Sequence, residues 1–228
     1  MSQLAAIGKR LWFGQNPELR KSRFHTQKLQ FALGSPGGVA DCVAAVATGV
    51  ARKAAGIRPV LPWITFPAMR FLRVRITPST RVFEWGCGMS TLWFERRCGE
   101  VWAVEDNPDW HATVSQRATR AEVLLLKGRA YVNKILEFAP GHFDLISVDG
   151  SYRLDCFRLA LERARPGSLL LVDNTDWASC PSQRSNGGDF YVIDQMLNEL
   201  GQDWEVHRFP GWGPCNFYAW ETTVCVRR

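Results

Sequence analysis

One stretch reads Val82-Phe83-Glu84-Trp85-Gly86-Cys87-Gly88-Met89-Ser90-Thr91: an apolar run ends in a carboxylate and then passes through two glycines into a helix start. Glycine lets a backbone turn sharply and approach a ligand closely, and the first N–H groups of a helix can bind an anionic group. Ser90 or Thr91 suits the helix cap. Thr91 stands where the third glycine of a G-x-G-x-x-G fingerprint belongs, which argues against a dinucleotide. The alternative is a tight strand-to-helix turn that binds nothing.

The next apolar run, Val101–Glu105, ends in a carboxylate 21 residues after Glu84 and continues into Asp106. An acid about 20 residues beyond a glycine turn can accept hydrogen bonds from both hydroxyls of a ribose. An isolated acid at a strand end is usually only solvated. Together with the glycine turn, the spacing favours a ligand that contains a nucleoside.

Short apolar runs and amphipathic stretches alternate from Arg81 onward. The expected strands are 82–84, 101–105, 123–127, 143–148 and 168–172, and the expected helices between them are 91–97, 108–118, 131–138 and 153–164. This alternation predicts parallel strands with right-handed crossovers and helices on both faces. After a helix near 190–200, strands 204–208 and 217–226 are joined by a link with two Gly and two Pro, so we expect them to pair antiparallel. The predicted fold class is an α/β sandwich with a reversed terminal strand.

Composition places the chain among ordinary globular proteins. It has 228 residues, of which 46% are hydrophobic and 22% charged, and this balance excludes a disordered chain. The seven cysteines are scattered without a C-x-x-C pair, which predicts reduced thiols and a cytoplasmic location. The Ala/Gly-rich run 37–51 is interrupted by Asp41 and is too short for a membrane span.

Charge is unevenly distributed along the chain. Residues 1–81 contain 13 Lys and Arg against two acids, whereas residues 82–228 contain 15 against 20. We expect two parts: a basic N-terminal arm with an Ala-rich helix, 1–58, which folding does not require, and an α/β domain, 59–228. The arm is either a solvated extension, a transit segment, or a contact for a membrane surface or macromolecule. Nucleic acid is a disfavoured partner because no aromatic-basic motif is present.

The pattern Glu84-x-Gly86-x-Gly88 followed by Glu105, in this strand order, resembles the class I S-adenosylmethionine (SAM)-dependent methyltransferases over about residues 57–228. The resemblance implies a Rossmann-like three-layer sandwich whose mostly parallel seven-stranded sheet has its last strand antiparallel. Residues 84–93 and 211–220 are similar to a poorly characterised bacterial group with an E-[YW]-G-x-G-x-S-T-L-W motif. The cofactor residues implied are Glu84, Gly86 and Gly88 along the methionine, Ser90 and Thr91 beside it, Glu105 at the ribose, and Asp106 and Asp149. Lys127-Gly128 departs from the polar or acidic adenine contact of many relatives.

Three acids follow the last two parallel strands and are the catalytic candidates: Asp149, Asp173 and Asp176. Asp149, Asp173 and Asn174 resemble the metal site of the catechol-type O-methyltransferases, which implies Mg²⁺ or another divalent cation that lowers the pKa of a substrate hydroxyl. Without a metal, Asp149 or Asp176 is the candidate base. Capping or turn-forming roles are the alternative.

The function expected is O-methylation of a small-molecule or glycan hydroxyl. Gly150, Ser151 and Tyr152 would form the rim of the site, and Trp177, Trp212 and Tyr218 are either substrate contacts or core. Two other functions stay open: a scaffold that binds SAM without turnover, and a methyltransferase of protein or nucleic acid that docks through the basic arm.

Overall fold

The structure is a computed structural model that describes Gly34 and residues 37–228. Seven strands form one sheet. The strands are β1 (Arg81–Trp85), β2 (Glu100–Glu105), β3 (Glu122–Leu125), β4 (Leu145–Val148), β5 (Leu169–Asp173), β6 (Trp204–Gly211) and β7 (Trp220–Arg227). The helices are α4 (Gly38–Ala55), α5 (Phe66–Arg73), α6 (Met89–Glu95), α7 (Pro108–Ser115), α8 (Gly128–Asn133), α9 (Arg153–Arg163), α10 (Pro181–Ser185) and α11 (Asp189–Glu199), with the 3₁₀ turns η1 (Lys134–Glu137) and η2 (Thr175–Ser179).

The strands lie in the order β3-β2-β1-β4-β5-β7-β6. All neighbours are parallel except β7, which runs antiparallel to both β5 and β6. The predicted α/β sandwich with a reversed last strand is therefore confirmed. The chain moves outward from β1 through β2 to β3 and then crosses back to β4 on the other side of β1. The carboxyl ends of β1 and β4 thus form the topological switch point, where open α/β sheets bind their ligands.

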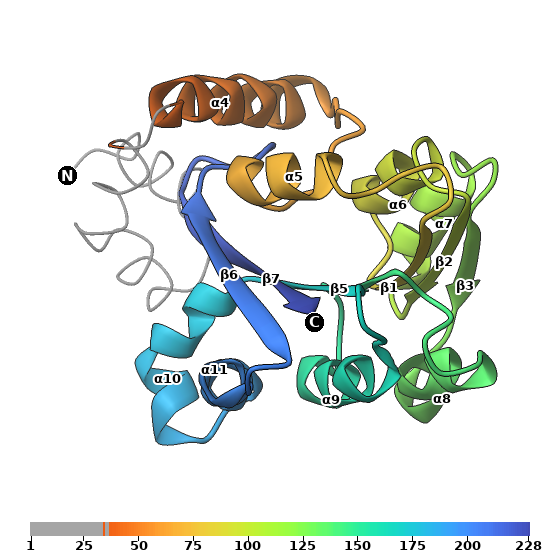
Figure 1. The fold of residues 1–228 in the computed structure, drawn as a ribbon. Coiled ribbons are helices and arrows are strands. Elements are labelled where there is room, and N and C mark those ends of the chain that lie inside the picture. Colours follow the sequence, from red (N-terminus) through yellow and green to blue (C-terminus); the bar gives the residue numbers. More distant parts are fainter. Residues whose placement is uncertain (1–33, 35–36) are drawn as a thin grey trace.

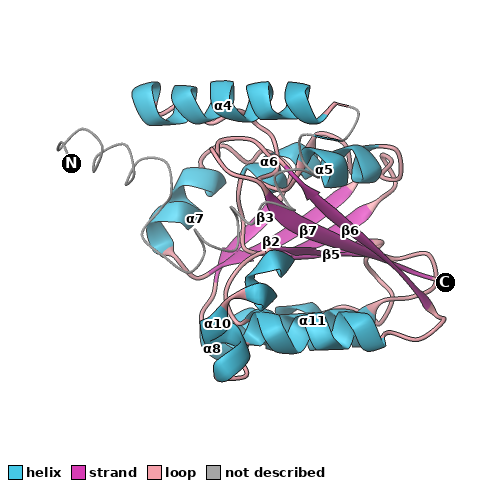
Figure 2. Cartoon of the chain, turned by 90° about the vertical axis from the view of Figure 1, so that its left-hand side faces the viewer, coloured by secondary structure: helices cyan, strands magenta, loops and turns pink. Residues whose placement is uncertain are grey.

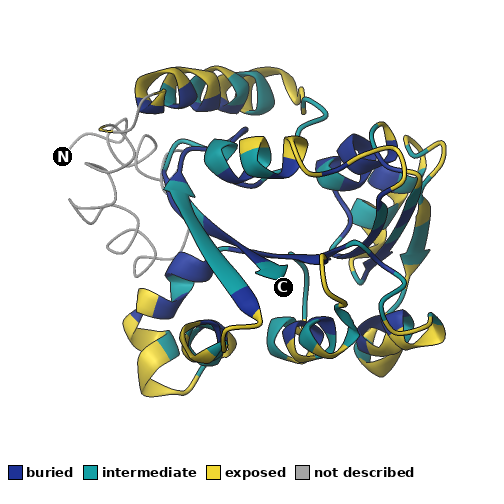
Figure 3. Ribbon diagram, viewed as in Figure 1, coloured by how far each residue is buried: buried dark blue, intermediate teal, exposed yellow. Residues whose placement is uncertain are grey.

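Two apolar layers cover the sheet (Figure 1). On one face α5 and α6 bury Leu72 and Phe94 against Val82 and Leu171. On the other face α9 and α11 bury Phe157 and Ile193 among a second set of strand residues. Figure 2 shows the sheet between these helical layers, and the strands are mostly buried, as Figure 3 shows. Within the described residues no helix is long and apolar enough to cross a bilayer.

Helix α4 packs on the sheet domain above α5 and the β6–β7 connection (Figure 1). Asp41 and Arg70 share two hydrogen bonds of 2.8 Å each. Ala45 is fully buried beside Trp212. Residues 1–33, 35 and 36 of the predicted basic arm lie outside the described residues, and the predicted boundary between residues 58 and 59 stays a prediction.

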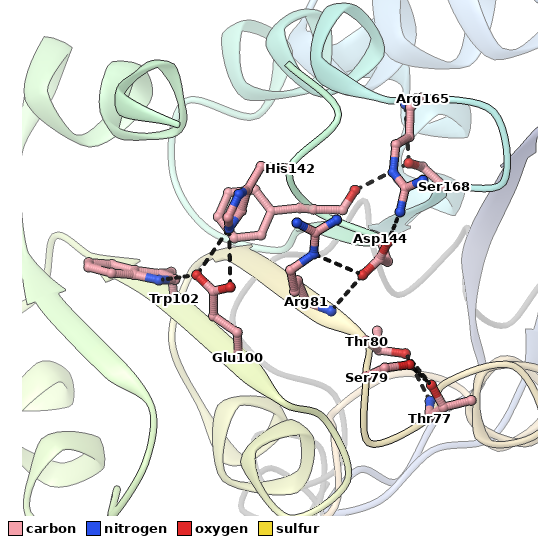
Figure 4. A network of polar contacts seen from close by, with 11 residues as sticks. Thr77, Ser79, Thr80, Arg81, Glu100, Trp102, His142, Asp144, Arg165 and Ser168 are labelled. Carbon is pink, nitrogen blue, oxygen red and sulfur yellow. Dashed lines mark hydrogen bonds and ion pairs between the residues drawn. The ribbon is translucent and has the colours of Figure 1, made fainter. Parts of the chain in front are cut away.

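The amino ends of the strands are joined by a polar network (Figure 4). The Asp144 carboxylate accepts from the Arg81 backbone N–H at 2.8 Å and also pairs with the Arg81 and Arg165 guanidinium groups. Nearby, Glu100 accepts from the Trp102 indole and lies 3.1 Å from the His142 ring. These contacts fix the relative positions of β1, β2 and β4 at the edge opposite the switch point.

Several element boundaries differ from the prediction by a few residues. The predicted helix 131–138 begins at Gly128 and tightens into η1, and the segment between β5 and α11 adds η2 and α10. Strand β6 continues to Gly211, past the predicted end at residue 208. Short turns such as these lack a full period of apolar residues, so sequence pattern alone does not indicate them.

Candidate active site

A cavity of about 470 Å³ opens at the carboxyl ends of the parallel strands. Its walls come from the ends of β1, β2, β4 and β5, from α4 and the connector after it, and from the segment before β7. The lining residues are Arg52, Trp63, Gly86, Cys87, Gly88, Met89, Ser90, Glu105, Asp106, Trp110, Asp149, Gly150, Ser151, Asp173, Asn174, Trp177, Asn216, Tyr218 and Trp220. The structure thus brings most of the predicted site residues to one place.

The turn after β1 forms the floor of the cavity. Gly86 has a φ of +95°, and a Cβ there would lie 2.7 Å from the backbone of Gly150 at the end of β4. Glycine is therefore required at this position by the contact between two strand ends, before any ligand is considered. Gly88 has extended backbone, and the nearest atom to a Cβ there would be the Ser90 hydroxyl at 3.4 Å. The space beside Gly88 remains open towards the cavity.

Glu84 and Thr91 lie beneath the turn and do not line the cavity. Both are fully buried, and the Thr91 hydroxyl donates to Glu84 Oε2 at 2.5 Å while accepting from the Gly88 N–H at 2.9 Å. Burial raises the pKa of Glu84 to about 8, against the hydrogen bonds that it accepts. These two residues hold the shape of the turn, and Ser90, one position before Thr91, is a lining residue of the cavity.

Glu105 lines the cavity at the end of β2. Its Oε1 accepts from the backbone N–H groups of Asp106 at 3.1 Å and Asn107 at 2.9 Å, which fixes the carboxylate. Burial raises the pKa of Glu105, although these two backbone hydrogen bonds oppose the shift. Asp106 also lines the cavity. A fixed carboxylate beside a glycine turn is the arrangement that the sequence spacing predicted.

Asp149 and Arg153 form an ion pair of 2.9 Å at the end of β4. The same guanidinium donates to the carbonyls of Gly150 at 3.0 Å and Asp173 at 2.6 Å. Burial raises the pKa of Asp149 above its usual value, although the charge and hydrogen bond of Arg153 oppose the shift. Arg153 therefore ties the ends of β4 and β5 together and orients the Asp149 carboxylate.

Asp173 ends β5 and is only 3% exposed. Its carboxylate accepts from the Trp220 indole at 2.9 Å, the Thr222 hydroxyl and the Asn174 amide at 2.7 Å. Burial and then the charge of Asp149 raise the pKa of Asp173 to about 8. Asn174 follows with a φ of +62°, an uncommon conformation for a residue with a side chain. Burial and the nearby Asp149 carboxylate therefore favour the protonated form of Asp173.

Asp176, Trp212 and Tyr152 do not line the cavity. Asp176 is buried in η2, where its Oδ1 accepts from the Glu221 N–H at 3.3 Å. Trp212 packs on α4, and Tyr152 is 44% exposed at the start of α9. Trp177 and Tyr218, the other two aromatic candidates, do line the cavity.

The chain matches no protein-family model and no curated protein sequence. Among solved structures, it is similar to the O-methyltransferase TomG of tomaymycin synthesis from Streptomyces achromogenes, in complex with SAM, with a TM-score of 0.59 and 20% identity over 81% of this chain and 89% of that one. An O-methyltransferase from Bacillus cereus, in complex with S-adenosylhomocysteine (SAH), gives a TM-score of 0.58 and 18% identity over 88% and 96% of the two chains. The chain has the class I methyltransferase fold.

At these identities the likeness shows the fold alone. An rRNA methylase from Streptococcus thermophilus is also similar, with a TM-score of 0.53 and 14% identity over 75% of this chain and 97% of that one. The methyltransferase fold therefore does not indicate by itself which acceptor this chain takes.

The acids beside the cavity do not fit a divalent cation. Both oxygens of Asp173 accept hydrogen bonds from protein donors, Asp149 is paired with Arg153, and Asn174 turns its N–H towards Asp173. In the described part of the chain no group of three His, Cys, Asp or Glu could hold a metal. A hard cation needs several free oxygen ligands, so the geometry gives the predicted metal site no support.

Four aromatic or basic residues of the cavity wall were not predicted. Arg52 belongs to α4, Trp63 to the connector after it, Trp110 to α7, and Trp220 to the start of β7. Trp110 was visible in the sequence beside the predicted Asp106, but Arg52 and Trp63 precede the first strand and carry no motif. Their position depends on how α4 packs, which no local pattern indicates.

Proposed function

We propose that this protein is a SAM-dependent methyltransferase that methylates a hydroxyl of a small molecule. The observation that carries the proposal is the cavity at the switch point, in which Glu105, fixed by two backbone N–H groups, lies beside the glycine turn. The likeness of fold to O-methyltransferases that bind SAM or SAH supports it. A hydroxyl group of a glycan would be methylated by the same chemistry, so the proposal includes glycan acceptors.

The cavity residues divide into two groups along the strand ends. Glu105 would accept hydrogen bonds from the ribose hydroxyls, and Ser90 with the open side of Gly88 would accommodate the methionine part. Asp173, Asn174 and Tyr218 lie at β5 and before β7, on the side left for the acceptor. Bound SAM would supply an activated methyl group, so the protein mainly has to align the acceptor oxygen and remove its proton.

Asp149 is the group that we propose as the base. Burial raises the pKa of both acids, but Arg153 pairs with Asp149 and stabilises its charged form, whereas the Asp173 carboxylate accepts hydrogen bonds from the neutral side chains of Trp220, Thr222 and Asn174. The acceptor O–H bond breaks as Asp149 takes the proton, an O–C bond forms with the methyl group, and the S–C bond of SAM breaks to give SAH. No metal is needed in this sequence of steps.

The test compares two glutamates at opposite ends of one strand. Glu105→Gln keeps an oxygen for the two backbone N–H groups but loses one acceptor for the ribose, so SAM and SAH should bind more weakly by about 1.5–3 kcal/mol, or roughly 10- to 150-fold. Glu100→Gln, at the amino end of β2, should bind both within about twofold of the parent. Isothermal titration calorimetry measures the affinities of the parent and of both variants for SAM and SAH.

If the parent binds neither SAM nor SAH, or if Glu105→Gln binds as the parent does, the proposed cofactor site is wrong. Turnover is then followed as SAH release with a panel of phenols and sugars. Binding of SAM without any SAH release on the whole panel would favour the scaffold over the enzyme.

A further inference from the structure

Arg52 is the basic residue on the cavity wall, among the residues that the structure describes. It is half-buried near the end of α4, and its guanidinium lies over the Trp63 ring at 5.3 Å. Within the described residues it makes no ion pair with a carboxylate. A guanidinium that lines a cavity without a carboxylate partner is available to pair with an anionic group of a ligand.

Helix α4 is held against the rest of the fold about one turn before Arg52. The Thr48 hydroxyl accepts from the Cys215 N–H at 2.9 Å, and a Cβ on Gly49 would meet the Phe217 ring at 2.9 Å. Cys215 itself has a φ of +64°. The end of α4 is thus held against the segment before β7, which contributes Asn216 to the cavity wall.

The Trp63 ring joins Arg52 to the glycine turn. Trp63 contacts Trp110 with ring centroids 5.8 Å apart, and the Trp110 indole donates to the Cys87 carbonyl at 2.6 Å. The cation–π contact with the ring helps to position the guanidinium, whose N–H groups can still pair with an anion in the guanidinium plane. Arg52 is therefore positioned before any ligand binds.

The acidic and basic side chains of the cavity wall come from different parts of the fold. The acids of the wall all follow strands of the sheet: Glu105, Asp106, Asp149 and Asp173. Arg52 comes from outside the sheet and lies beside the segment that contains Asn216 and Tyr218, where the acceptor would enter. An acceptor with a negative group would be repelled by the strand ends and attracted by Arg52, which fixes its orientation.

On the basis of the proposed function, we propose that the methyl acceptor carries an anionic group, a carboxylate or a phosphate, that pairs with Arg52 while its hydroxyl lies at Asp149. Two parallel hydrogen bonds from a guanidinium suit either anion. The aromatic wall of Trp177, Tyr218 and Trp220 suits a planar acceptor body.

The test uses paired probes on protein saturated with SAH. The parent, Arg52→Gln and Lys53→Gln are titrated with 3,4-dihydroxybenzoate, its neutral amide, phenyl phosphate and phenol, and binding is followed by tryptophan fluorescence and calorimetry. Lys53 is the matched control because it is the next residue of α4, carries the same charge and is exposed off the cavity wall.

The parent and Lys53→Gln should bind the charged member of at least one pair about tenfold more tightly than the neutral one. Arg52→Gln should lose this preference, keep its affinity for the neutral probe and bind SAH as the parent does. Preference for carboxylate over phosphate, or the reverse, distinguishes the two sources of the anion.

Equal binding of charged and neutral probes by the parent, or no binding of any charged probe, overturns the inference. So does a preference that survives in Arg52→Gln. If Arg52→Gln binds SAH weakly but binds 5′-methylthioadenosine, which lacks the amino acid, as the parent does, then Arg52 pairs with the cofactor and the inference is wrong. Failure of the parent to bind SAH counts against the proposed function instead.

Discussion

The two edges of the sheet are built from the same strands but in opposite ways. At the amino edge, polar groups are paired with one another, as in the Asp144 contacts with Arg81 and Arg165. At the carboxyl edge the chain places a glycine with positive φ, two buried acids and a guanidinium without an ion partner among the described residues. Paired charges suit stability, whereas buried acids and unusual backbone conformations gather at functional sites. We therefore expect variants at the two edges to separate stability from binding.

The largest effect is expected at Gly86. Its φ of +95° disfavours a β-branched residue, and a side chain there would collide with the Gly150 backbone. Gly86→Val should lower the free energy of unfolding by about 3–5 kcal/mol, because the strain and the overpacking add. Urea unfolding followed by circular dichroism measures the change.

Gly88→Ala is the matched variant in the same turn. Gly88 has extended backbone, and a Cβ there would lie 3.4 Å from the nearest atom, so the free energy of unfolding of the variant should be within about 1 kcal/mol of that of the parent. The variant should nevertheless bind SAM more weakly, because the added methyl group occupies space beside the turn that the cofactor would use. Equal stability losses in the two variants would mean that the turn is only a structural device.

The sequence was sufficient for the strands and for the residues that follow them. Runs such as Val101–Glu105 combine a buried apolar pattern with a polar end, and parallel topology then brings those ends together. Glu105 and Asp149 were found in this way, and both line the cavity.

The rest of the site depends on tertiary packing. Asp173 and Asp176 are equivalent in the sequence, but only Asp173 faces the cavity because η2 turns Asp176 towards the Glu221 N–H. Glu84 was expected beside the methionine, yet it lies under the turn with Thr91. Arg52 reaches the wall only because α4 packs against residues more than 160 positions later in the chain.

A substitution of Asp144 tests how much the amino edge contributes to stability. Burial acts to raise its pKa, but the hydrogen bonds from Arg81 and Arg165 outweigh burial and hold the pKa below its usual 3.8. Asp144→Asn should lower the free energy of unfolding at pH 7 by about 1.5–3 kcal/mol without changing SAH affinity. Because the folded-state pKa is lowered, the loss should be complete above the usual pKa and should shrink as the pH falls below it. A difference that persists unchanged at acid pH, or a fall in SAH affinity, would contradict this prediction.

Asp173 tests the carboxyl edge by its pH dependence. Burial raises its pKa from 3.8 to about 8, so between these values the folded protein holds a proton that the unfolded chain releases. Stability should therefore fall as the pH rises across this window, by up to ~1.4 kcal/mol per pH unit for this group. Asp173→Asn should flatten the dependence, as urea unfolding from pH 4 to pH 9 would show. The pKa of Glu84 is raised in the same way, but Glu84 is present in both proteins. If the free energy of unfolding depends on pH equally in the parent and in Asp173→Asn, then Asp173 is ionised in the folded protein.

The smallest effect is expected for Glu100→Gln at the amino edge. The His142 ring lies 3.1 Å from Glu100, but both side chains are about one-third exposed, and such pairs contribute about 0–1 kcal/mol. The glutamine also keeps an oxygen for the Trp102 indole, which donates to Glu100 at 2.8 Å. The free energy of unfolding should therefore change by less than about 1 kcal/mol. A larger loss would mean that the amino edge acts as one cooperative network, in which case His142→Gln combined with Asp144→Asn should cost more than the sum of the two single changes.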